Sequence, residues 1–262
     1  MEKREVKLDR NKAIQQWESL KTVYQNLQKN DIIEELLMID GARGCEDMVF
    51  CANQTFPWQM PDGEKLVVMS KMRHLSRQAE VPYFEEWFLK RNYKPLQLKV
   101  ATMFEGMGDV IPHPGKRLLY GGYGQRSDRS AYTELTSILN VPVIALKLVN
   151  PNFYHLDTCF VPLTEHAVML CEQAFTAEGM AMIRRCFEQV YLIPEEEAVK
   201  TFCLNAHVIP HSDNNKNTAI IQLGSKYALA ALIQCGYHVY EIETSEFMKS
   251  GGSVFCMKMM VY

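Results

Sequence analysis

The chain has 262 residues, of which 47% are apolar and 23% charged, and its formal charge is −3. This length is sufficient for a well-buried core, and the absence of a basic run argues against a surface that follows nucleic-acid phosphates. No apolar run is long enough to span a bilayer. We therefore expect neither nucleic acid nor a membrane as a partner.

Eight cysteines are scattered along the chain without a CxxC pair, at positions 45, 51, 159, 171, 186, 203, 235 and 256. In a chain of this size that spacing is typical of reduced thiols rather than of a disulfide framework or a zinc site. The charged N-terminal stretch MEKREVKLDRNK also lacks the apolar segment of a secretory signal. We expect a cytoplasmic protein without a metal.

Strand and helix patterns alternate along the first half of the chain. Apolar residues at helical spacing predict a first helix over 8–29, capped by Asp9 or Asn11. The following elements are predicted in order: strands over 47–52 and 65–69, a helix over 80–92 with Pro82 in its first turn, a strand over 96–101 and a hairpin over 109–123 turning at Pro114-Gly115.

The second half continues the alternation. We predict a helix over 130–140, strands over 141–149, 153–163 and 166–170, a helix over 176–191, strands over 205–210 and 218–224, a helix over 225–236, a strand over 238–243, a short helix over 245–249 stopped by Gly251-Gly252, and a final strand over 253–261. Strand pairs separated by single helices fit a repeated β-β-α-β unit better than a doubly wound α/β sheet. Without a linker or composition break, we expect one domain over 1–262.

Two stretches carry polar residues beside apolar strands. In EDMVFCANQTF, Asp47 and Asn53 flank an apolar core, which is also how an ordinary strand with polar ends looks. In FEGMGDVI, Glu105 stands between an apolar strand and a glycine-rich turn, with Asp109 four residues later. Such a turn could present a carboxylate at a strand end, although turns are rich in glycine and aspartate in any case.

Two further stretches carry groups suited to nucleophilic chemistry. His155 and Asp157 are two residues apart in FYHLDTCFVPL, so on a strand they would project from one face among apolar neighbours. Burying both without a purpose is costly, which indicates a shared site. Cys256 follows Gly251-Gly252, a position suited to the mouth of a pocket or simply to core filling, and thiolate chemistry requires a nearby base or positive charge.

Together these stretches resemble the guanidine-modifying enzymes of the pentein superfamily, which include arginine deiminase, arginine dihydrolase, dimethylarginine dimethylaminohydrolase and the amidinotransferases. The resemblance runs from about Asp9 to the C-terminus and rests on EDMVFCAN, FEGMGD, GYGQRSD, HLDT and SEFMKSGGSVFCM in this order. It implies an α/β-propeller, a ring of ββαβ repeats around a central polar channel, which agrees with the repeat pattern.

The resemblance also implies a mechanism that needs no cofactor. Cys256 would attack the guanidinium carbon, and His155 would act as acid and then as base around a covalent S-alkylthiouronium intermediate. Glu105 is implied to be a third catalytic residue, and its carboxylate would contact the planar guanidinium cation beside the substrate-binding residues. By resemblance, those substrate-binding residues are Asp47, Asn53, Asp109 and Asp157, with Arg126 on the substrate α-carboxylate.

Two features distinguish this chain within the superfamily. Asn53 stands where many members carry an aspartate, which looks most like the arginine dihydrolase branch, and His155-Leu-Asp157 looks more like enzymes that act on free arginine than on its methylated form. Relatives also open with a strand ending in Asn-Pro-Trp-Met, and Met1 stands where that methionine would. The resemblance therefore implies that the first strand is absent and that a sheet edge is exposed.

Three functions are compatible with these residues. The first is a cysteine hydrolase that cleaves C–N bonds of arginine or a methylated arginine. The second is an amidinotransferase that passes the amidino group to an amine, and the third is a binding protein on the same ring without catalysis. The expected partner is a small guanidine in each enzymatic case, and the sequence leaves homo-oligomer formation open.

Overall fold

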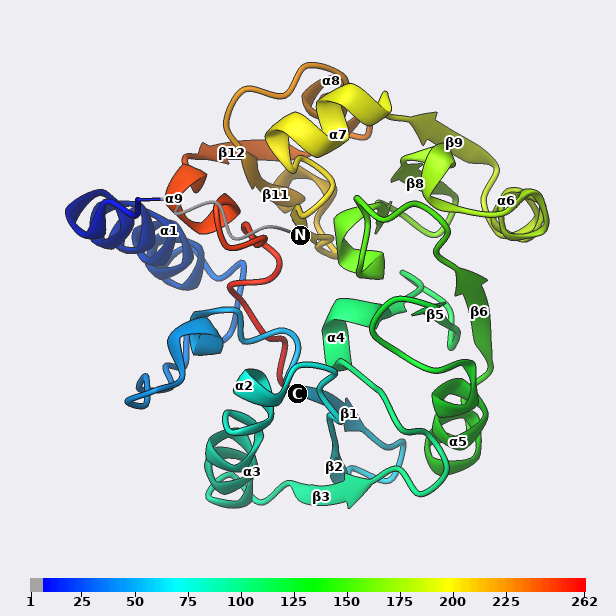
Figure 1. The fold of residues 1–262 in the computed structure, drawn as a ribbon. Helices are drawn as coiled ribbons and strands as arrows, with labels where there is room; N and C mark the ends of the chain where they lie inside the picture. The colour runs from blue at the N-terminus through cyan, green and yellow to red at the C-terminus, as the bar shows by residue number, and fades with distance from the viewer. Residues whose placement is uncertain (1–6) are drawn as a thin grey trace.

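A computed structural model describes residues 7–262 of the chain. Four three-stranded sheets stand around a ring, and the main helices lie at its periphery (Figure 1). Each sheet is built in the same way: two antiparallel strands, then one helix or two, then a third strand parallel to the second. The ring of ββαβ repeats predicted from the sequence is thus the fold of the protein.

The first two repeats fill one half of the ring. The first contains β1 (Thr55–Gln59), β2 (Lys65–Met69), α2 (Leu75–Gln78), α3 (Val81–Leu89) and β3 (Lys94–Gln97). A single turn of helix, α4 (Gly106–Asp109), leads into the second, which contains β4 (Val110–Pro112), β5 (Leu119–Tyr123), α5 (Arg129–Leu139) and β6 (Val143–Lys147).

The other two repeats follow after a 3₁₀ turn, η2 (Leu156–Thr158). The third contains β7 (Phe160–Pro162), β8 (Ala167–Leu170), η3 (Glu172–Ala174), α6 (Ala177–Cys186) and β9 (Gln189–Leu192). After α7 (Glu195–Thr201), the fourth contains β10 (His207–Ile209), η4 (Asn214–Lys216), β11 (Thr218–Gln222), α8 (Tyr227–Gln234) and β12 (His238–Ile242).

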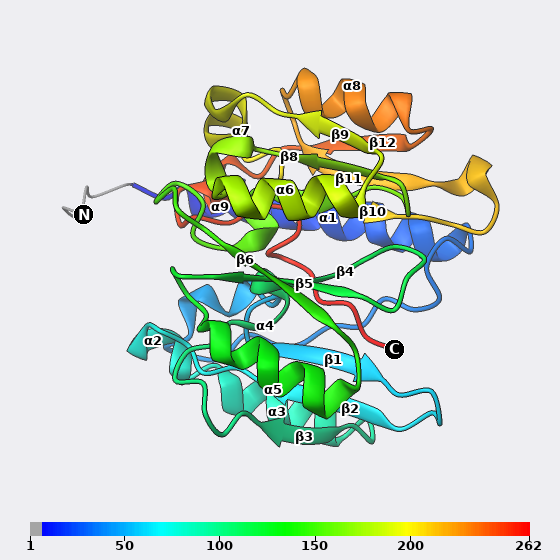
Figure 2. The same ribbon diagram turned by 90° about the vertical axis from the view of Figure 1, so that its right-hand side faces the viewer.

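Burial increases from the rim of the ring toward its centre. The middle strands β5, β8 and β11 are buried almost throughout, whereas the third strands β6, β9 and β12 are partly exposed. The helix that links them covers the outer part of each sheet, as α5 and α6 do in Figure 2. The short turns α4 and η2 and the C-terminal segment occupy the interior of the ring (Figure 1).

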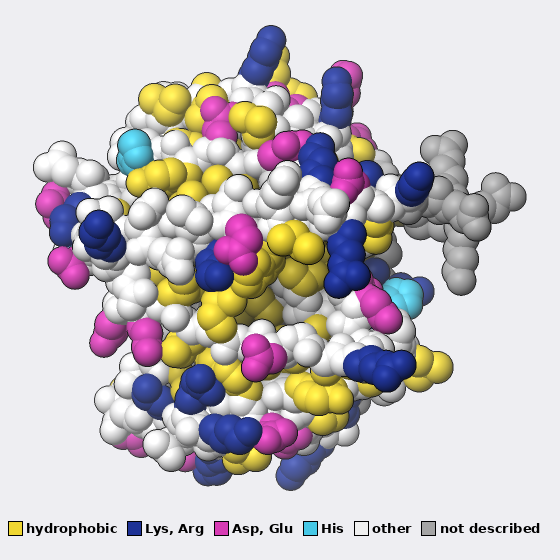
Figure 3. Space-filling view, turned by 90° about the vertical axis from the view of Figure 1, so that its left-hand side faces the viewer, with side chains coloured by type: hydrophobic (Ala, Val, Ile, Leu, Met, Phe, Trp, Pro, Cys, Tyr) yellow, Lys and Arg dark blue, Asp and Glu magenta, His cyan; other side chains and the backbone are white. Residues whose placement is uncertain are grey.

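The remaining sector of the ring contains no strand in the part of the chain that the structure describes. It is formed by α1 (Arg10–Lys29), the loop over 30–54 with η1 (Glu46–Val49), α9 (Ser245–Met248) and the C-terminal segment. Asp9 caps α1 by accepting a hydrogen bond from the Lys12 amide. Figure 3 shows this side of the molecule, where apolar side chains line a hollow. The predicted absence of a first strand concerns residues 1–6 and anything before them, which lie outside the described residues.

Three predicted strands are wrong, although each apolar run is buried. Residues 47–52 form η1 and a turn, and the first strand is instead 55–59. Residues 153–156 belong to a loop and η2, so only 160–162 of the predicted strand pairs in a sheet. Residues 253–261 lie in the interior without a ladder, because their apolar side chains are enclosed on more than one side. An apolar run reports burial, whereas it does not fix backbone conformation.

The predicted helix over 176–191 is too long. It ends at Cys186, and Gln189–Leu192 forms β9. The helix α7 was not predicted at all. No helix within residues 7–262 is both long enough and apolar enough to cross a bilayer.

Candidate active site

Glu105 and His155 form a buried pair at the centre of the ring. Glu105 precedes α4 and His155 precedes η2, and the two side chains are joined by a hydrogen bond of 2.6 Å between Nε2 and Oε2. Both are buried, at 0% and 2% exposure. The short turns bring together two residues that are 50 positions apart in the chain.

Glu105 is held as a carboxylate by its neighbours. Its Oε1 accepts a hydrogen bond from the Arg73 amide at 2.9 Å, and its Oε2 lies 3.3 Å from Nη1 of Arg126. Burial by itself raises the pKa of this carboxyl, but His155 and Arg126 outweigh it and lower the pKa to about 2. An ionised carboxylate only accepts, so Nε2 of His155 carries the proton and donates. Nδ1 of a neutral His155 is then the free base.

Gly108 brings Asn53 against this pair. A Cβ at position 108 would collide with Nδ2 of Asn53 and would lie 3.4 Å from Cγ of His155. Only glycine leaves room for both side chains here. Asn53 is 2% exposed, and its Nδ2 has no hydrogen-bond partner among the described residues.

Cys256 lies in a turn of the C-terminal segment, where the side chain of Asn205 holds it. Oδ1 of Asn205 accepts from the amides of Ser253 and Cys256 at 3.2 and 3.1 Å. Nδ2 donates to Sγ of Cys256 at 3.1 Å and to the carbonyl of Asp157 at 3.1 Å. One amide therefore fixes both the backbone and the thiol, and ties them to the segment that carries His155.

The thiol of Cys256 donates to Oδ2 of Asp157 at 3.2 Å. Burial, and next the charge of Asp157, raise the pKa of the Cys256 thiol well above its usual value. Burial likewise raises the pKa of Asp157 to about 7, even though the contacts with Cys256 and Asn205 lower it. The thiol of Cys256 therefore keeps its proton at neutral pH and donates it in the hydrogen bond to Asp157.

Gly251 ends the turn that follows α9, and its φ of 86° lies in the left-handed region that favours glycine. A Cβ at Gly252 would collide with the ring of Phe50. The lack of a side chain at Gly252 therefore lets the C-terminal segment pass close to Phe50 in the 30–54 loop.

The remaining predicted residues lie at different distances from this centre. Both carboxylate oxygens of Asp109 are occupied, by the Ser127 hydroxyl at 2.6 Å and the Leu156 amide at 3.1 Å, so Asp109 orients the turn that carries His155. Burial raises the pKa of Asp109 to about 7. Arg126 stacks over Tyr154, with its guanidinium carbon 5.0 Å from the ring centroid. Its side chain is 19% exposed, so Arg126 lies at the boundary with solvent.

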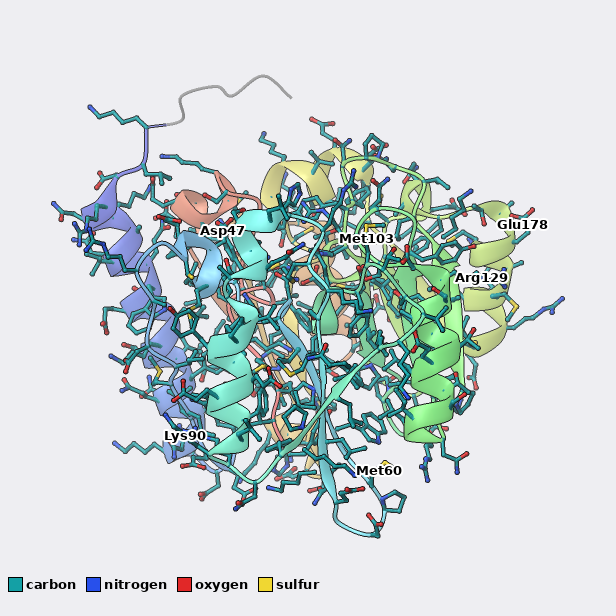
Figure 4. All side chains as sticks on the ribbon, turned by 60° about the horizontal axis from the view of Figure 1, so that its bottom comes forward. Asp47, Met60, Lys90, Met103, Arg129 and Glu178 are labelled. Atoms are coloured by element: carbon teal, nitrogen blue, oxygen red, sulfur yellow. The ribbon has the colours of Figure 1, made fainter. Side chains whose placement is uncertain are left out.

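Asp47 lies farther out. It is half-buried on η1 next to α2 (Figure 4), and its hydrogen bonds within 7–262 are made by its backbone carbonyl, which accepts from Arg77 and from the Phe50 amide. The structure therefore does not bring the Asp47 carboxylate against the other predicted side chains.

Sequence reasoning missed Asn205 and Arg77. Arg77 donates to Oδ1 of Asn53 at 2.9 Å and pairs with Glu80. The spacing Arg-x-x-Glu in SRQAE was a usable sign of that pair, whereas nothing local distinguishes Asn205 from any asparagine before a strand. Among residues 7–262, no group of three or more His, Cys, Asp or Glu side chains is arranged to hold a metal.

Three buried polar atoms at this centre have no partner among the described residues: Nδ2 of Asn53, Nδ1 of His155 and Oδ1 of Asp157. Buried polar atoms are nearly always hydrogen-bonded in proteins. Nδ1 of a neutral His155 and Oδ1 of Asp157 are acceptors that match a ligand rich in N–H groups, whereas Nδ2 of Asn53 is a donor that requires an acceptor.

The chain is similar in sequence to several known proteins. The chain is 32% identical to a protein of Caenorhabditis elegans over 95% of its length and 84% of the relative. It is 32% identical, over 97% of its length, to the bifunctional arginine dihydrolase/ornithine cyclodeaminase AgrE of Nostoc sp., but covers 34% of that protein. It is 29% identical to N(G),N(G)-dimethylarginine dimethylaminohydrolase of Mycobacterium tuberculosis, covering 94% of this chain and 75% of the relative.

Solved structures share the ring. The substrate-bound N-terminal domain of ArgZ, a cyanobacterial arginine dihydrolase, superposes with a TM-score of 0.85 at 29% identity, covering 96% of this chain and 87% of that one. The enzyme named DDAH from Pseudomonas aeruginosa, complexed with citrulline, superposes with a TM-score of 0.78 at 20% identity, covering 98% of this chain and 91% of that one, which shows a similar fold. The family model described as "N,N dimethylarginine dimethylhydrolase, eukaryotic" matches residues 1–262. The chain therefore belongs to this family, within the pentein superfamily and near its arginine dihydrolase-like branch.

Proposed function

We propose that the protein is a cysteine-dependent hydrolase that cleaves C–N bonds in the guanidinium group of arginine or of a methylated arginine. The observation that carries this proposal is the buried contact between Cys256 and Asp157, two residues from a His155 that Glu105 holds by Nε2. A binding protein would gain nothing from enclosing a thiol, an imidazole and two carboxylates together. Relatives named as arginine dihydrolases and dimethylarginine dimethylaminohydrolases support the same class.

The substrate cation fits the charge of this centre. A guanidinium presents planar N–H donors that match carboxylate oxygens. Asp157 offers Oδ1, which lacks a partner among the described residues, and Glu105 offers a carboxylate whose pKa is about 2. The bound cation also stabilises a thiolate, so Cys256 can transfer its proton to Asp157 or to Nδ1 of His155 when substrate binds.

The chemical steps follow from these positions. The thiolate of Cys256 adds to the guanidinium carbon, and the C–N bond to the leaving amine then breaks as His155 gives that amine a proton. This leaves an S-alkylthiouronium group on the sulfur. His155, now neutral, takes a proton from water as the water oxygen adds to the same carbon. The C–S bond then breaks as the hydroxyl proton passes to the departing sulfur, which gives the thiol of Cys256 and a neutral ureido product. A variant of ArgZ has been solved covalently bonded to a reaction intermediate, which supports this route.

Arginine is the substrate that the site residues favour. Asp157 faces the thiol directly, where methyl groups on the reacting nitrogen would be crowded against an acid. Asn53 in place of an aspartate favours the dihydrolase outcome, in which both terminal nitrogens leave as ammonia, the carbon leaves as carbon dioxide, and ornithine remains. Dimethylarginine is the second candidate, because the matching family model describes enzymes of that compound.

Mass analysis of the products from arginine and from dimethylarginine, incubated separately with the enzyme, tests the proposal. We expect citrulline or ornithine with ammonia from arginine, and loss of turnover in Cys256→Ser. Cys171→Ser is the matched control, because Cys171 is also buried but donates to Gln173 at 3.2 Å, away from the site. An enzyme that turns over neither compound, or a Cys256→Ser variant as active as the control, would overturn the proposed function.

A haloacetamidine, which alkylates active-site thiols, separates catalysis from mere binding. Faster labelling of Cys256 than of the other seven cysteines, all of which are free thiols, is expected for a nucleophile held beside a carboxylate site. Equal labelling of all eight would favour the non-catalytic interpretation. The eight unpaired thiols also support the reducing, cytoplasmic location that we propose.

A further inference from the structure

A buried ion pair stands behind Asn53. Arg77 of α2 and Glu80 are 7% and 1% exposed, with Nη2 and Oε2 3.1 Å apart. The same guanidinium donates to the carbonyls of Asp47 and Phe50 at 3.1 and 3.0 Å, and from Nη1 to Oδ1 of Asn53 at 2.9 Å. All of the partners outside the ion pair therefore belong to the loop that carries Asn53.

Two further hydrogen bonds hold the backbone of this loop near Asn53. Gln54 donates to Oε2 of Glu80 at 2.5 Å, and the Ser70 hydroxyl donates to the backbone carbonyl of Asn53 at 2.6 Å. The backbone of Asn53 thus has little freedom, and the direction of its side-chain amide is the remaining variable.

Hydrogen-bond chemistry settles that direction. A guanidinium has only donors, so the atom of Asn53 that meets Arg77 must be the oxygen. The NH₂ group then points away from Arg77, against Gly108 and His155, where it is buried without a partner among the described residues. An aspartate at position 53 would present a second oxygen in this place.

We infer that Arg77 is a positioning residue that fixes the Asn53 amide with its donor group toward the reacting centre, and so provides the site with a hydrogen-bond donor for a neutral oxygen of the ligand. A guanidinium carbon bears no acceptor, so arginine gains nothing from this donor. The carbonyl oxygen of a ureido compound, such as the product of the first hydrolysis, accepts from it. The arrangement selects for retention of the ureido compound at Cys256, and this inference rests on the proposed function.

Calorimetric titration of arginine and of citrulline into Cys256→Ser protein tests the inference, with the ratio of the two dissociation constants as the readout. Loss of the overall fold, or of contacts that both ligands use, changes both dissociation constants together. Loss of the oriented NH₂ group of Asn53 changes the dissociation constant of citrulline alone. In Arg77→Lys, a single ammonium cannot hold both Glu80 and Asn53. We expect the ratio to shift against citrulline by about fivefold to tenfold, the value of one neutral hydrogen bond.

Two variants guard against a misfolded Arg77→Lys protein. Asn53→Asp leaves Arg77 in place and replaces the donor by an oxygen, so the ratio should shift in the same direction and arginine should bind more tightly. Arg117→Lys is the control, because Arg117 is an exposed arginine that donates to the Leu139 carbonyl at 3.3 Å, and the ratio of the two dissociation constants should not change.

The outcomes separate the two ideas. If Cys256→Ser protein with Arg77 and Asn53 intact binds neither ligand, the proposed function fails and the inference fails with it. If it binds both, but Arg77→Lys and Asn53→Asp weaken them by the same factor, the proposed function stands and the positioning role is overturned.

Discussion

Replacing Asp157 by asparagine should make the protein more stable at alkaline pH while it abolishes activity. Asp157 is 1% exposed, and burial raises its pKa from 3.8 to about 7 in the folded state. The folded protein therefore holds this proton more tightly than the unfolded chain does. The resulting stability is fully present below pH 3.8 and is lost as the pH rises through 7.

The size of the effect follows from the shift. About three pH units at about 1.4 kcal/mol each give a loss of about 4 kcal/mol once Asp157 is ionised in the folded state. About 3 kcal/mol of that loss falls between pH 5 and pH 8. An amide at position 157 does not ionise, so Asp157→Asn avoids the loss.

Urea unfolding at several pH values measures the difference directly. We expect the gain of Asp157→Asn over the parent protein to grow by about 3 kcal/mol from pH 5 to pH 8. Asp128→Asn is the control, because hydrogen bonds from Thr102 and Met103 lower the pKa of Asp128, so this carboxyl stays ionised and the effect of its replacement should not change from pH 5 to pH 8. A gain for Asp157→Asn that does not change with pH would refute the reasoning.

Three further predictions use the same site. Glu105→Gln should lose up to about 3 kcal/mol of unfolding free energy at pH 7, which urea unfolding measures. The carboxyl pKa of about 2 means that ionised Glu105 stabilises the fold above pH 4.5, and this stabilisation disappears as the pH falls toward 2. Asn205→Ala should cost about 2 to 6 kcal/mol, since the amides of Ser253 and Cys256 lose their acceptor, and equal stability of variant and parent would contradict it. Arginine binding to Cys256→Ser should release close to one proton at pH 6, because Asp157 ionises beside the cation, and almost none at pH 9. Calorimetry in buffers of different ionisation enthalpy measures the number of protons released. An uptake of protons would contradict the ionisation of Asp157 on binding.

The repeated ββαβ architecture could be predicted because local sequence patterns determine each of its strands, turns and helices. Each ββαβ unit has its own turn signals and amphipathic helix, and the hairpin turning at Pro114-Gly115 lies where the sequence placed it. The errors fall where tertiary packing overrides those patterns. The segment after Gly252 has the composition of a strand, but its amide hydrogen bonds go to Asn205 and to its own turns, which no period in the sequence reports.

The candidate site shows the same division. Glu105, His155, Asp157 and Cys256 were predicted from their chemistry and order, and the structure joins them as two buried pairs, Glu105 with His155 and Asp157 with Cys256. The predicted strands were wrong for His155 and Asp157, which flank Leu156 on a 3₁₀ turn, and for Cys256, which lies in a turn of the C-terminal segment. Asn205 could not be found, because its role exists only through four contacts with residues about 50 positions away.

The distribution of charge explains why these residues need one another. Glu105 is matched by His155 and Arg126 and is ionised at low pH, whereas burial raises the pKa of both Asp109 and Asp157 to about 7. Asp109 is compensated by two hydrogen bonds, so the acid whose charge is least matched is Asp157, the one that touches the thiol of Cys256. In the proposed function, a guanidinium bound between Asp157 and Glu105 offsets that deficit beside the sulfur of Cys256, where the proposed thiolate forms. The energetic cost of keeping Asp157 buried and ionised is then recovered when this cation is bound, and a neutral ligand would not recover it.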